Sequence, residues 1–454
     1  MTKINRKIPP KPLTNQVVPN IKKPLLFKMN NGLTVLLTEN YKFPIIRVHF
    51  VLNYPIFLEK EKAGIKKVFG NMLRSGTKNF SKEEIDQKID YMGSKLFTSF
   101  SNISLFSLQK YFEESFFIFS DILINSQFDN IIEFNKIIKQ KIIDIDISEK
   151  DPNAILERVK NVLYFGINHP YGEYETYKTI QNITLLDLKQ LYNQYYCPSI
   201  SYISFIGSIS MKQVMSLCHK YLLKWNKKHI HIIENKINQK FIQKKLEISI
   251  VDLPTLTQSF ICFGHPVFFK KSDSIYFSAL LANGILGVGA QSRLFLKIRE
   301  KSAYTYGIYS ILKPDKYIGY FSIYTQVRND VTDKAIKDIL KTIKEMKDNI
   351  SNEELDIKKE EICGQFILNL EDPSKINDLF ISELKDNLQV GFYEKYLNHI
   401  KNVNIYDVYQ ICKNFFSTTT GQMIIVGNSK KIFNKIQKIG YSIYFFDKFG
   451  NKLK

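Results

Sequence analysis

Arg299 and Tyr306 are the residues of this chain whose types and spacing first suggest chemistry. They lie seven residues apart in SRLFLKIREKSAYTYGIYS, residues 292–310, directly after a glycine-rich run. A guanidinium and a phenol both donate hydrogen bonds. On spacing alone, an alternative stays open in which Arg299 makes a surface ion pair and Tyr306 packs in a core. A role for the pair therefore depends on what the rest of the sequence supplies.

The glycine-rich run itself, NGILGVGAQSR, places Gly284, Gly287 and Gly289 close together. Glycines let backbone amides approach phosphates, so a nucleotide site is one interpretation. However, the spacing differs from the dinucleotide fingerprint and no P-loop lysine follows. The run is therefore expected to be a turn or a packing feature, and not a nucleotide site.

The histidines offer no catalytic centre. His229 and His231 form an H-x-H pair in a basic stretch, where they could chelate a metal weakly or be two exposed surface histidines. His169 and His265 are expected to fill loops or turns. No G-x-S-x-G is present, so a serine hydrolase has no support.

The charge and the cysteines exclude further classes. The 454 residues carry a formal charge of +20, but the lysines are scattered and no nucleic-acid-binding motif accompanies them. We expect a lysine-rich solvated surface that binds no nucleic acid and that favours acidic partners or peptides. The five cysteines are far apart and form no CxxC, so reduced thiols are expected.

No targeting or membrane segment is apparent. The first 23 or so residues are basic and contain several prolines, but they include no apolar segment of signal-peptide length. No apolar run of about 18 residues follows, so no membrane span is predicted. A cytoplasmic protein is the simplest expectation, with a periplasmic location as the alternative if the N-terminus is misassigned.

The two halves of the chain repeat one pattern. Asp187 opens DLKQLYNQYYCPSISYISFIG and Asp407 opens DVYQICKNFFSTTTGQMIIVG. Each segment predicts an amphipathic helix, a short polar turn and a strand that ends at a glycine. Upstream, the dipeptides Asp151-Pro152 and Asp372-Pro373 each follow a long helical stretch at nearly the same offset. Agreement at two places in the same order predicts a duplicated domain.

Local signals indicate the class of that domain. Two strands are expected about a turn at Asn31 and Gly32, another strand in IIRVHFVLNYP, a capping box opening a helix at Ser81, and helix through most of residues 110–147. Strands and long helices without strict alternation predict an α+β fold, built twice. The predicted parts are an extended arm (1–23), an N-terminal domain (24–228), a linker (229–246) and a C-terminal domain (247–454).

Three stretches resemble the pitrilysin/insulinase group of metallopeptidases. They are AGIKKVFGNMLRSGT (63–77), EKDPNAILERVKNVLYFGINHPYG (149–172) and NGILGVGAQSRLFLKIREKSAYTYGIYS (283–310). The resemblance is to the short, two-domain form, similar to the mitochondrial processing peptidase subunits and their bacterial relatives. It implies two homologous domains of antiparallel sheet packed with helices, arranged as half of a clamshell around a peptide chamber.

The first stretch departs from the family's catalytic motif. The active domain needs His-x-x-Glu-His, in which two imidazoles bind Zn²⁺ and the glutamate acts as general base. The aligned positions here are Lys67, Gly70 and Asn71, and the downstream ligand position falls near Ile143 or Asp144. Lysine is a cation, glycine has no side chain and an amide is a poor zinc ligand. We therefore expect this chain to bind no zinc and to be inactive alone.

The third stretch keeps the family's second motif. By resemblance, Arg299 and Tyr306 match the Arg and Tyr that reach the zinc site from across the chamber in active relatives, where they contact substrate or the developing oxyanion. The same resemblance gives Gly284, Gly287 and Gly289 a part in admitting substrate, from a loop between two helices; packing is the alternative.

These features together predict a noncatalytic subunit of a heteromeric zinc peptidase. The expected partner is a homologous chain that carries His-x-x-Glu-His and the zinc, and the expected substrates are peptides. The alternative is a peptidase-derived scaffold or peptide-binding protein with no part in catalysis.

Overall fold

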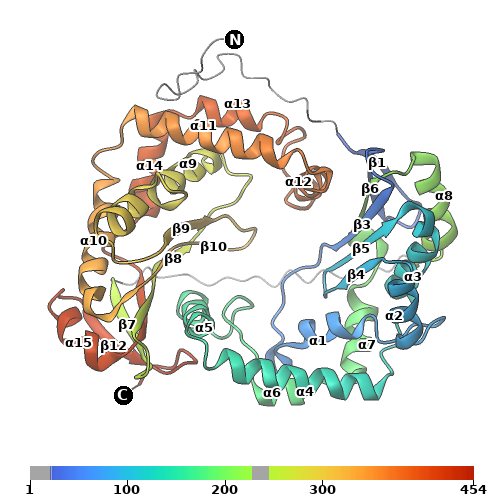
Figure 1. Ribbon diagram of the computed structural model, residues 1–454, viewed down its shortest axis with the longest axis horizontal. Helices are drawn as coiled ribbons and strands as arrows, with labels where there is room; N and C mark the ends of the chain where they lie inside the picture. The colour runs from blue at the N-terminus through green and yellow to red at the C-terminus, as the bar shows by residue number, and fades with distance from the viewer. Residues whose placement is uncertain (1–20, 22, 227–244, 454) are drawn as a thin grey trace, which may run out of the picture.

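The structure is a computed structural model, which describes residues 21, 23–226 and 245–453. Figure 1 shows two halves, each with one β-sheet and a set of helices, that face one another. Most of the predicted arm (1–23) and of the predicted linker (229–246) lies outside the described residues. The proposed domain boundaries at these segments therefore stay predictions.

The first half contains a six-stranded sheet in the order β1-β2-β6-β3-β5-β4. Its strands are β1 (Leu25–Lys28), β2 (Thr34–Glu39), β3 (Ile45–Leu52), β4 (Lys95–Thr98), β5 (Asn102–Leu108) and β6 (Ser201–Gly207). All neighbours are antiparallel except β2 and β6. Alternate residues of β3 and β5 are buried, which fits a sheet with one face on the core.

Helices cover this sheet and extend from it. The α-helices are α1 (Ile65–Met72), α2 (Lys82–Tyr91), α3 (Phe112–Asn125), α4 (Ile131–Ser148), α5 (Pro152–Phe165), α6 (Tyr177–Gln181), α7 (Leu185–Tyr195) and α8 (Met211–Leu222). Short 3₁₀ turns are η1 (Lys60–Lys62), η2 (Gln109–Tyr111) and η3 (Pro198–Ile200). The core they form is rich in aromatic rings, with Phe50, Phe69, Phe116 and Tyr196 fully buried.

The second half contains a six-stranded sheet in the order β12-β7-β11-β8-β10-β9. Its strands are β7 (Glu247–Asp252), β8 (Gln258–Val267), β9 (Ile308–Lys313), β10 (Gly319–Arg328), β11 (Gln422–Gly427) and β12 (Ser442–Phe446). Its helices are α9 (Tyr276–Gly287), the π-helix η4 (Phe295–Lys301), η5 (Asn329–Val331), α10 (Thr332–Glu345), α11 (Asn352–Asn369), α12 (Pro373–Lys385), α13 (Tyr396–Asn402), α14 (Ile405–Phe415) and α15 (Ser429–Gln437).

The two sheets have the same arrangement over five strands. Strands β2-β6-β3-β5-β4 correspond in order to β7-β11-β8-β10-β9, and in both sets only the first pair is parallel. The sheets differ at one edge, where β1 is antiparallel to β2 whereas β12 is parallel to β7. The prediction of an α+β fold built twice is confirmed.

The repeated sequence signals occupy equivalent places. Helices α7 and α14 both begin with a capping box, closed by Asp187 in one and by Asp407 in the other. They lead to β6 and β11, which end at Gly207 and Gly427 as predicted. The capping box at Ser81 and the turn at Asn31 and Gly32 are also confirmed, with Gly32 at a φ of 95°.

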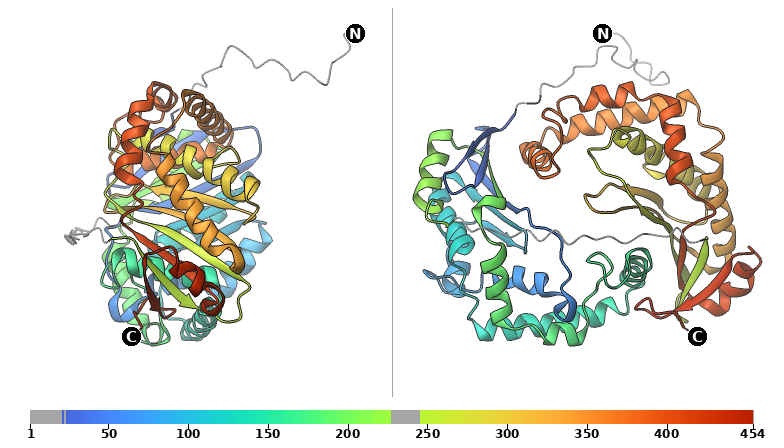
Figure 2. Two further views of the ribbon diagram at one scale, coloured as in Figure 1. Left: turned by 90° about the vertical axis from the view of Figure 1, so that its left-hand side faces the viewer. Right: turned by 180° about the vertical axis from the view of Figure 1, so that it is seen from behind.

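The two helices that begin with Asp-Pro each pack on the sheet of the other half. Asp151 caps α5 and Asp372 caps α12, with proline in the first turn of each helix. Helix α5 contacts β8 and β11, whereas α12 contacts β2 and β6. Figure 1 shows α12 beside the first sheet and α5 beside the second, and Figure 2 shows the same arrangement from behind.

Both crossings are held by apolar and polar contacts. Ile155, Leu156 and Val159 of α5 join a buried cluster that includes Ile424 and Val426 of β11. Ile381 of α12 packs on Leu36 and Val51 of the first sheet. Asn377 of α12 is fully buried, accepts a 2.6 Å hydrogen bond from the Thr38 hydroxyl and donates to the Phe205 carbonyl.

None of the helices in the described part of the chain is long and apolar enough to cross a membrane.

Candidate functional site: a degenerate metal motif and an exposed Arg/Tyr segment

Helix α1 carries the three positions that match the zinc motif of active peptidases. It follows Gly64, whose φ of 100° lets the chain turn into the helix, and it buries Val68, Phe69 and Met72. Lys67 and Asn71 are exposed, and their spacing of four places them on one helix face. The positions of the two lost imidazoles are therefore side by side at the surface of α1.

Gly70, at the position of the general base, is buried against a neighbouring turn. A Cβ added to it would lie 2.7 Å from the Ser99 Cα, and the Gly70 carbonyl accepts a 2.7 Å hydrogen bond from the Thr98 hydroxyl. Such a separation is too short for any side chain without a shift of the backbone. The turn that follows β4 thus occupies the space that a glutamate would need.

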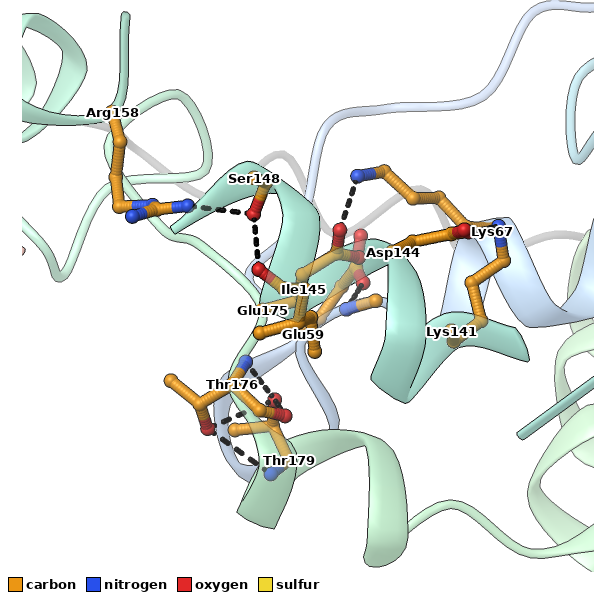
Figure 3. Close-up of polar contacts among 11 residues, drawn as sticks. Glu59, Lys67, Lys141, Asp144, Ile145, Ser148, Arg158, Glu175, Thr176 and Thr179 are labelled. Carbon is orange, nitrogen blue, oxygen red and sulfur yellow. Dashed lines mark hydrogen bonds and ion pairs between the residues drawn. The ribbon is translucent and has the colours of Figure 1, made fainter. Parts of the chain in front are cut away.

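Lys67, at one of the positions aligned with the zinc motif, pairs with a carboxylate. Its Nζ lies 2.6 Å from the Oε1 of Glu175, in the segment before α6. Figure 3 shows Lys67 reaching across to Glu175, with Asp144 of α4 beside them. Hydrogen bonds from Gln140 and Lys141, together with the charges of Lys141 and Lys67, lower the pKa of Asp144.

These residues do not fit a zinc ion. A metal would compete with the ammonium group of Lys67 for Glu175, and Asp144 already accepts from Gln140 and Lys141, each at 3.0 Å. Within residues 21, 23–226 and 245–453, no group of three His, Cys, Asp or Glu side chains is placed to hold a metal ion. Two lysines balance the two carboxylates here, because Lys67 pairs with Glu175 and Lys141 pairs with Asp144.

A cavity of about 310 Å³ opens beside this ion pair. Its walls combine opposite charges, and they include Glu59, Lys67, Arg158, Glu173 and Glu175. Most of these charged side chains already bond to other groups of the protein. Glu59 accepts from the Gly64 amide and pairs with Lys66, Glu173 accepts from the Glu59 amide, and Arg158 donates to Ser148.

Arg299 lies in the second half, on the π-helix η4. Its guanidinium is 4.5 Å from the Phe295 ring centre and its Nε is 3.7 Å from the adjacent Glu300. Neither contact fixes the side chain strongly, since exposed ion pairs contribute about 0–1 kcal/mol. The expected alternative of a surface ion pair describes this conformation, but a weak pair leaves the guanidinium free to change partner. π-Helices are rare and are frequent at functional sites.

Tyr306 is 93% exposed, so it does not pack in a core. It follows Ala303, a non-glycine residue with a φ of 52°, and lies in a short loop where Thr305 donates to the Gly307 carbonyl. Strained backbone of this kind persists when the surrounding structure holds it, and it is common at functional sites. The core-packing alternative for Tyr306 is therefore wrong.

Two side chains that sequence reasoning missed hold this segment in place. Arg293 precedes η4 and donates two hydrogen bonds of 2.7 Å to the two oxygens of Glu354, at the start of α11. Glu354 also closes the capping box of that helix with Ser351. The Ser351-x-x-Glu354 pattern was readable as a capping box. No local sequence pattern, however, predicted that Arg293 would bind Glu354, which lies 61 residues away.

The predicted glycine loop is a loop at only one of its three positions. Gly284 and Gly287 are buried in the last turns of α9, whereas Gly289 lies beyond the helix with a φ of 84°. An added Cβ would meet the Lys358 side chain at Gly284 and Ser310 at Gly287, each at less than 3.0 Å. These two glycines allow close packing on α11 and β9, and Gly287 is the last residue of α9.

His169 and His265 both have structural contacts. His169 is buried in a loop, as expected, and its Nδ1 accepts a hydrogen bond from the Tyr171 amide. His265 was expected in a loop or turn, but it is buried within strand β8, beside the Pro266 carbonyl. His229 and His231 lie outside the described residues.

The two halves of the expected site do not meet within this chain. Lys67, Gly70, Asn71 and Asp144 come together beside the first sheet. Arg299 and Tyr306 lie beside the second sheet. No hydrogen bond or ion pair among the described residues joins α1 to residues 292–310.

Known proteins resemble this chain along most of its length. The profile of the family described as "Peptidase M16 inactive domain" matches residues 182–362, a range that includes Arg299 and Tyr306 and excludes α1. An uncharacterized zinc protease of Bacillus subtilis, YmxG, is 24% identical over 78% of this chain and 86% of its own length. A Helicobacter pylori protein named non-peptidase homolog YmxG is 22% identical over 92% of this chain and 95% of its own.

A solved structure shows the same fold. The crystal structure of a peptidase M16 inactive domain from Pseudomonas fluorescens superposes with a TM-score of 0.77 at 20% identity, and covers 89% of this chain and 98% of the other. The relatives' names include both protease and non-peptidase, so names do not decide activity. In this chain Lys67, Gly70 and Asn71 stand where the zinc motif would be. The chain is thus similar to peptidase M16 proteins: residues 182–362 match the family's inactive domain, and the fold is that of a solved M16 inactive domain.

Proposed function

We propose that this chain is the noncatalytic subunit of a heteromeric zinc peptidase. It supplies Arg299, Tyr306 and part of a peptide chamber to a separate, homologous subunit that carries His-x-x-Glu-His and binds the zinc. That partner hydrolyses peptides, and the pair works in the cytoplasm. The α1 helix of this chain takes no part in the hydrolysis.

The observation that carries the proposal is the exposure of Tyr306. A tyrosine at 93% exposure contributes little to the core, yet it stands on a constrained loop that ends at β9 and is tied to the sheet by the bond from Thr325 to the Gly307 carbonyl. A solvated phenol on a backbone held in this way can donate to an atom of another molecule. An oxyanion that forms on a peptide carbonyl in the partner's site needs donors of this kind.

A second candidate, a peptidase-derived scaffold or peptide-binding protein, also has an observation in its favour. Gly284 and Gly287 are buried by packing and not exposed to a substrate. Packing thus explains Gly284 and Gly287, which weakens two of the three predicted substrate-binding glycines. The Arg/Tyr segment has no such packing explanation, and for that reason the subunit function ranks first.

Isolation of the complex tests the proposal first. The tagged chain is purified under mild conditions from the cytoplasmic fraction of its own cells, and the eluate is assayed for a co-purifying His-x-x-Glu-His polypeptide and for chelator-sensitive peptide cleavage. We expect both. A folded chain that comes out alone, without zinc or activity, would favour the scaffold.

Tyr306→Phe tests the role of the phenol in the reconstituted pair. Removal of one oxyanion donor lowers turnover by about 10²–10³-fold, so we expect a fall of that order in kcat with unchanged assembly. Tyr91→Phe is the matched control, because Tyr91 is 80% exposed on α2 and has no expected role. Equal turnover in both variants would rule out the assigned role.

A further inference from the structure

A second cavity, of about 630 Å³, lies where the two halves of the chain meet. The first half contributes the end of β3, the residues that follow it and Tyr171. The second half contributes residues 270–272, the turn between β9 and β10, and the exposed side of α12. Figure 1 shows the β9–β10 hairpin reaching from the second sheet towards the first. The volume falls within the range of roughly 300–1,000 Å³ that is usual for ligand sites.

The floor of this junction cavity is apolar. Val51 and Leu52 of β3 and Ile381 of α12 line it, and all three are buried. Tyr54, Tyr171 and Tyr317 add aromatic walls. Apolar or aromatic side chains of a ligand would thus find surface to cover.

The acidic residues of the junction cavity are already partnered. The Oδ1 atom of Asp315 accepts from the Tyr171 hydroxyl at 2.9 Å and from the amides of Tyr317 and Ile318 at 2.8 and 3.1 Å. Asp386 lies 3.3 Å from the Nζ of Lys271, and Asp378 lies 3.5 Å from the Nδ1 of His49. These contacts do not cancel the three carboxylate charges, but five lysines line the same cavity and outnumber them: Lys270, Lys271, Lys313, Lys316 and Lys385.

The lysines of the junction cavity, by contrast, are mostly uncompensated. Lys270, Lys313, Lys316 and Lys385 line it and are exposed. Lys313 and Lys316 lie over the rings of Tyr320 and Tyr317. In the part of the chain that the structure describes, none of these four forms an ion pair with a carboxylate. The smaller cavity beside Lys67 differs, because its lysine and arginine face three glutamates.

We propose that the junction cavity binds an acidic segment of a peptide. Its carboxylates meet the rim of Lys270, Lys313, Lys316 and Lys385, and a neighbouring apolar or aromatic side chain covers Ile381 and Val51. Charge complementarity of this kind sets which ligands bind and how fast they associate. The inference deepens the proposed function by naming its substrate class, and it rests on that function only in treating the ligand as a peptide.

Direct binding to this chain alone tests the inference. A fluorescein-labelled ten-residue peptide with alternating Glu and Phe is titrated with the chain at low and moderate salt, and fluorescence anisotropy is measured. Its Gln/Phe analogue is titrated in parallel. We expect the acidic peptide to bind about tenfold more tightly, with a difference that shrinks as salt rises.

The triple variant Lys270→Gln, Lys313→Gln, Lys316→Gln should remove most of this preference. The matched control is Lys334→Gln, Lys337→Gln, Lys344→Gln on α10, whose lysines are exposed, make no ion pair among the described residues and lie outside the cavity. Both variants carry the same net charge and alter only exposed side chains, so both are expected to fold, and circular dichroism checks this.

Equal affinity for the two peptides, or a preference that survives the cavity variant, would overturn the inference. A loss of preference in both variants would overturn it as well, because the effect would then come from net charge. These outcomes are independent of catalysis. If the preference follows the cavity lysines but Tyr306→Phe leaves the pair fully active, the acidic-peptide site stands and the proposed catalytic role of Tyr306 fails.

Discussion

At the scale of single residues, the loss of the metal motif is built into the packing as well as the chemistry. Lys67 and Asn71 are exposed and could be exchanged without disturbing the core. Gly70 cannot, because the Ser99 backbone lies where its Cβ would be. Restoring two histidines would therefore still leave no place for the general base. The absence of a general base on α1 therefore depends on the neighbouring turn as well as on the residue types at positions 67, 70 and 71.

Gly70→Ala measures this packing. We expect the free energy of unfolding to fall by about 1–3 kcal/mol, the usual cost of an added methyl group in a filled space. Gly364→Ala is the matched control, since Gly364 lies on the exposed side of α11 with open space around it and alanine has the higher helix propensity. Urea denaturation of both variants measures their free energies of unfolding. A Gly70 variant as stable as the Gly364 variant would mean that the turn after β4 gives way easily.

At the scale of elements, the segment that carries Arg299 and Tyr306 depends on one charged anchor. Burial raises the pKa of Glu354, but the hydrogen bonds from Arg293 and from the Ser351 amide outweigh burial and hold the pKa below its usual range. A carboxyl with a lowered folded-state pKa stabilises the protein above its unfolded pKa, and this stabilisation disappears as the pH falls through the folded value.

Glu354→Gln should therefore destabilise the protein at pH 7 and have a shrinking effect as the pH falls below about 4. The amide keeps an acceptor for the capping box but loses the ionic bond to Arg293. Glu345→Gln is the control, because the one ion pair that it forms with a described residue, Lys341, is long at 3.9 Å and exposed. Unfolding free energies across this pH range test the expectation, which an equal effect at pH 3 and pH 7 would contradict.

The elements also show what the sequence could predict. The capping box at Ser81, the hairpin at Gly32 and the two helix-to-strand repeats follow from residues within a few positions of one another, and the structure has all of them. Gly284 and Gly287 were expected in a loop, but their helical role is set by Lys358 and Ser310, which lie far away in sequence. Glu175 was missed for the same reason, since its partner Lys67 is 108 residues away.

At the scale of the whole molecule, α5 and α12 each pack on the sheet of the other half, and we expect this exchange to make the two halves unfold together. Each sheet has an apolar face that the other half's helix covers, by Ile155 and Val159 on one side and Ile381 on the other. A separated half would leave such a face in water. The sequence repeats predicted two similar domains, but no local sequence pattern could indicate that a helix of each half packs on the sheet of the other.

Ile155→Ala tests this coupling, because Ile155 is fully buried where α5 crosses onto the second sheet. We expect a loss of about 2–5 kcal/mol, a single unfolding transition, and lower hydrogen-exchange protection in β3 of the first sheet as well as in β8 of the second. Ile132→Ala on α4 is the control, since Ile132 is 80% exposed. Protection lost only in the second sheet would mean that the halves unfold separately. In that case, a peptide chamber assembled from both halves would need the partner subunit to hold it closed. If the halves are coupled, the junction cavity and the Arg/Tyr segment keep a fixed relative position before any partner binds.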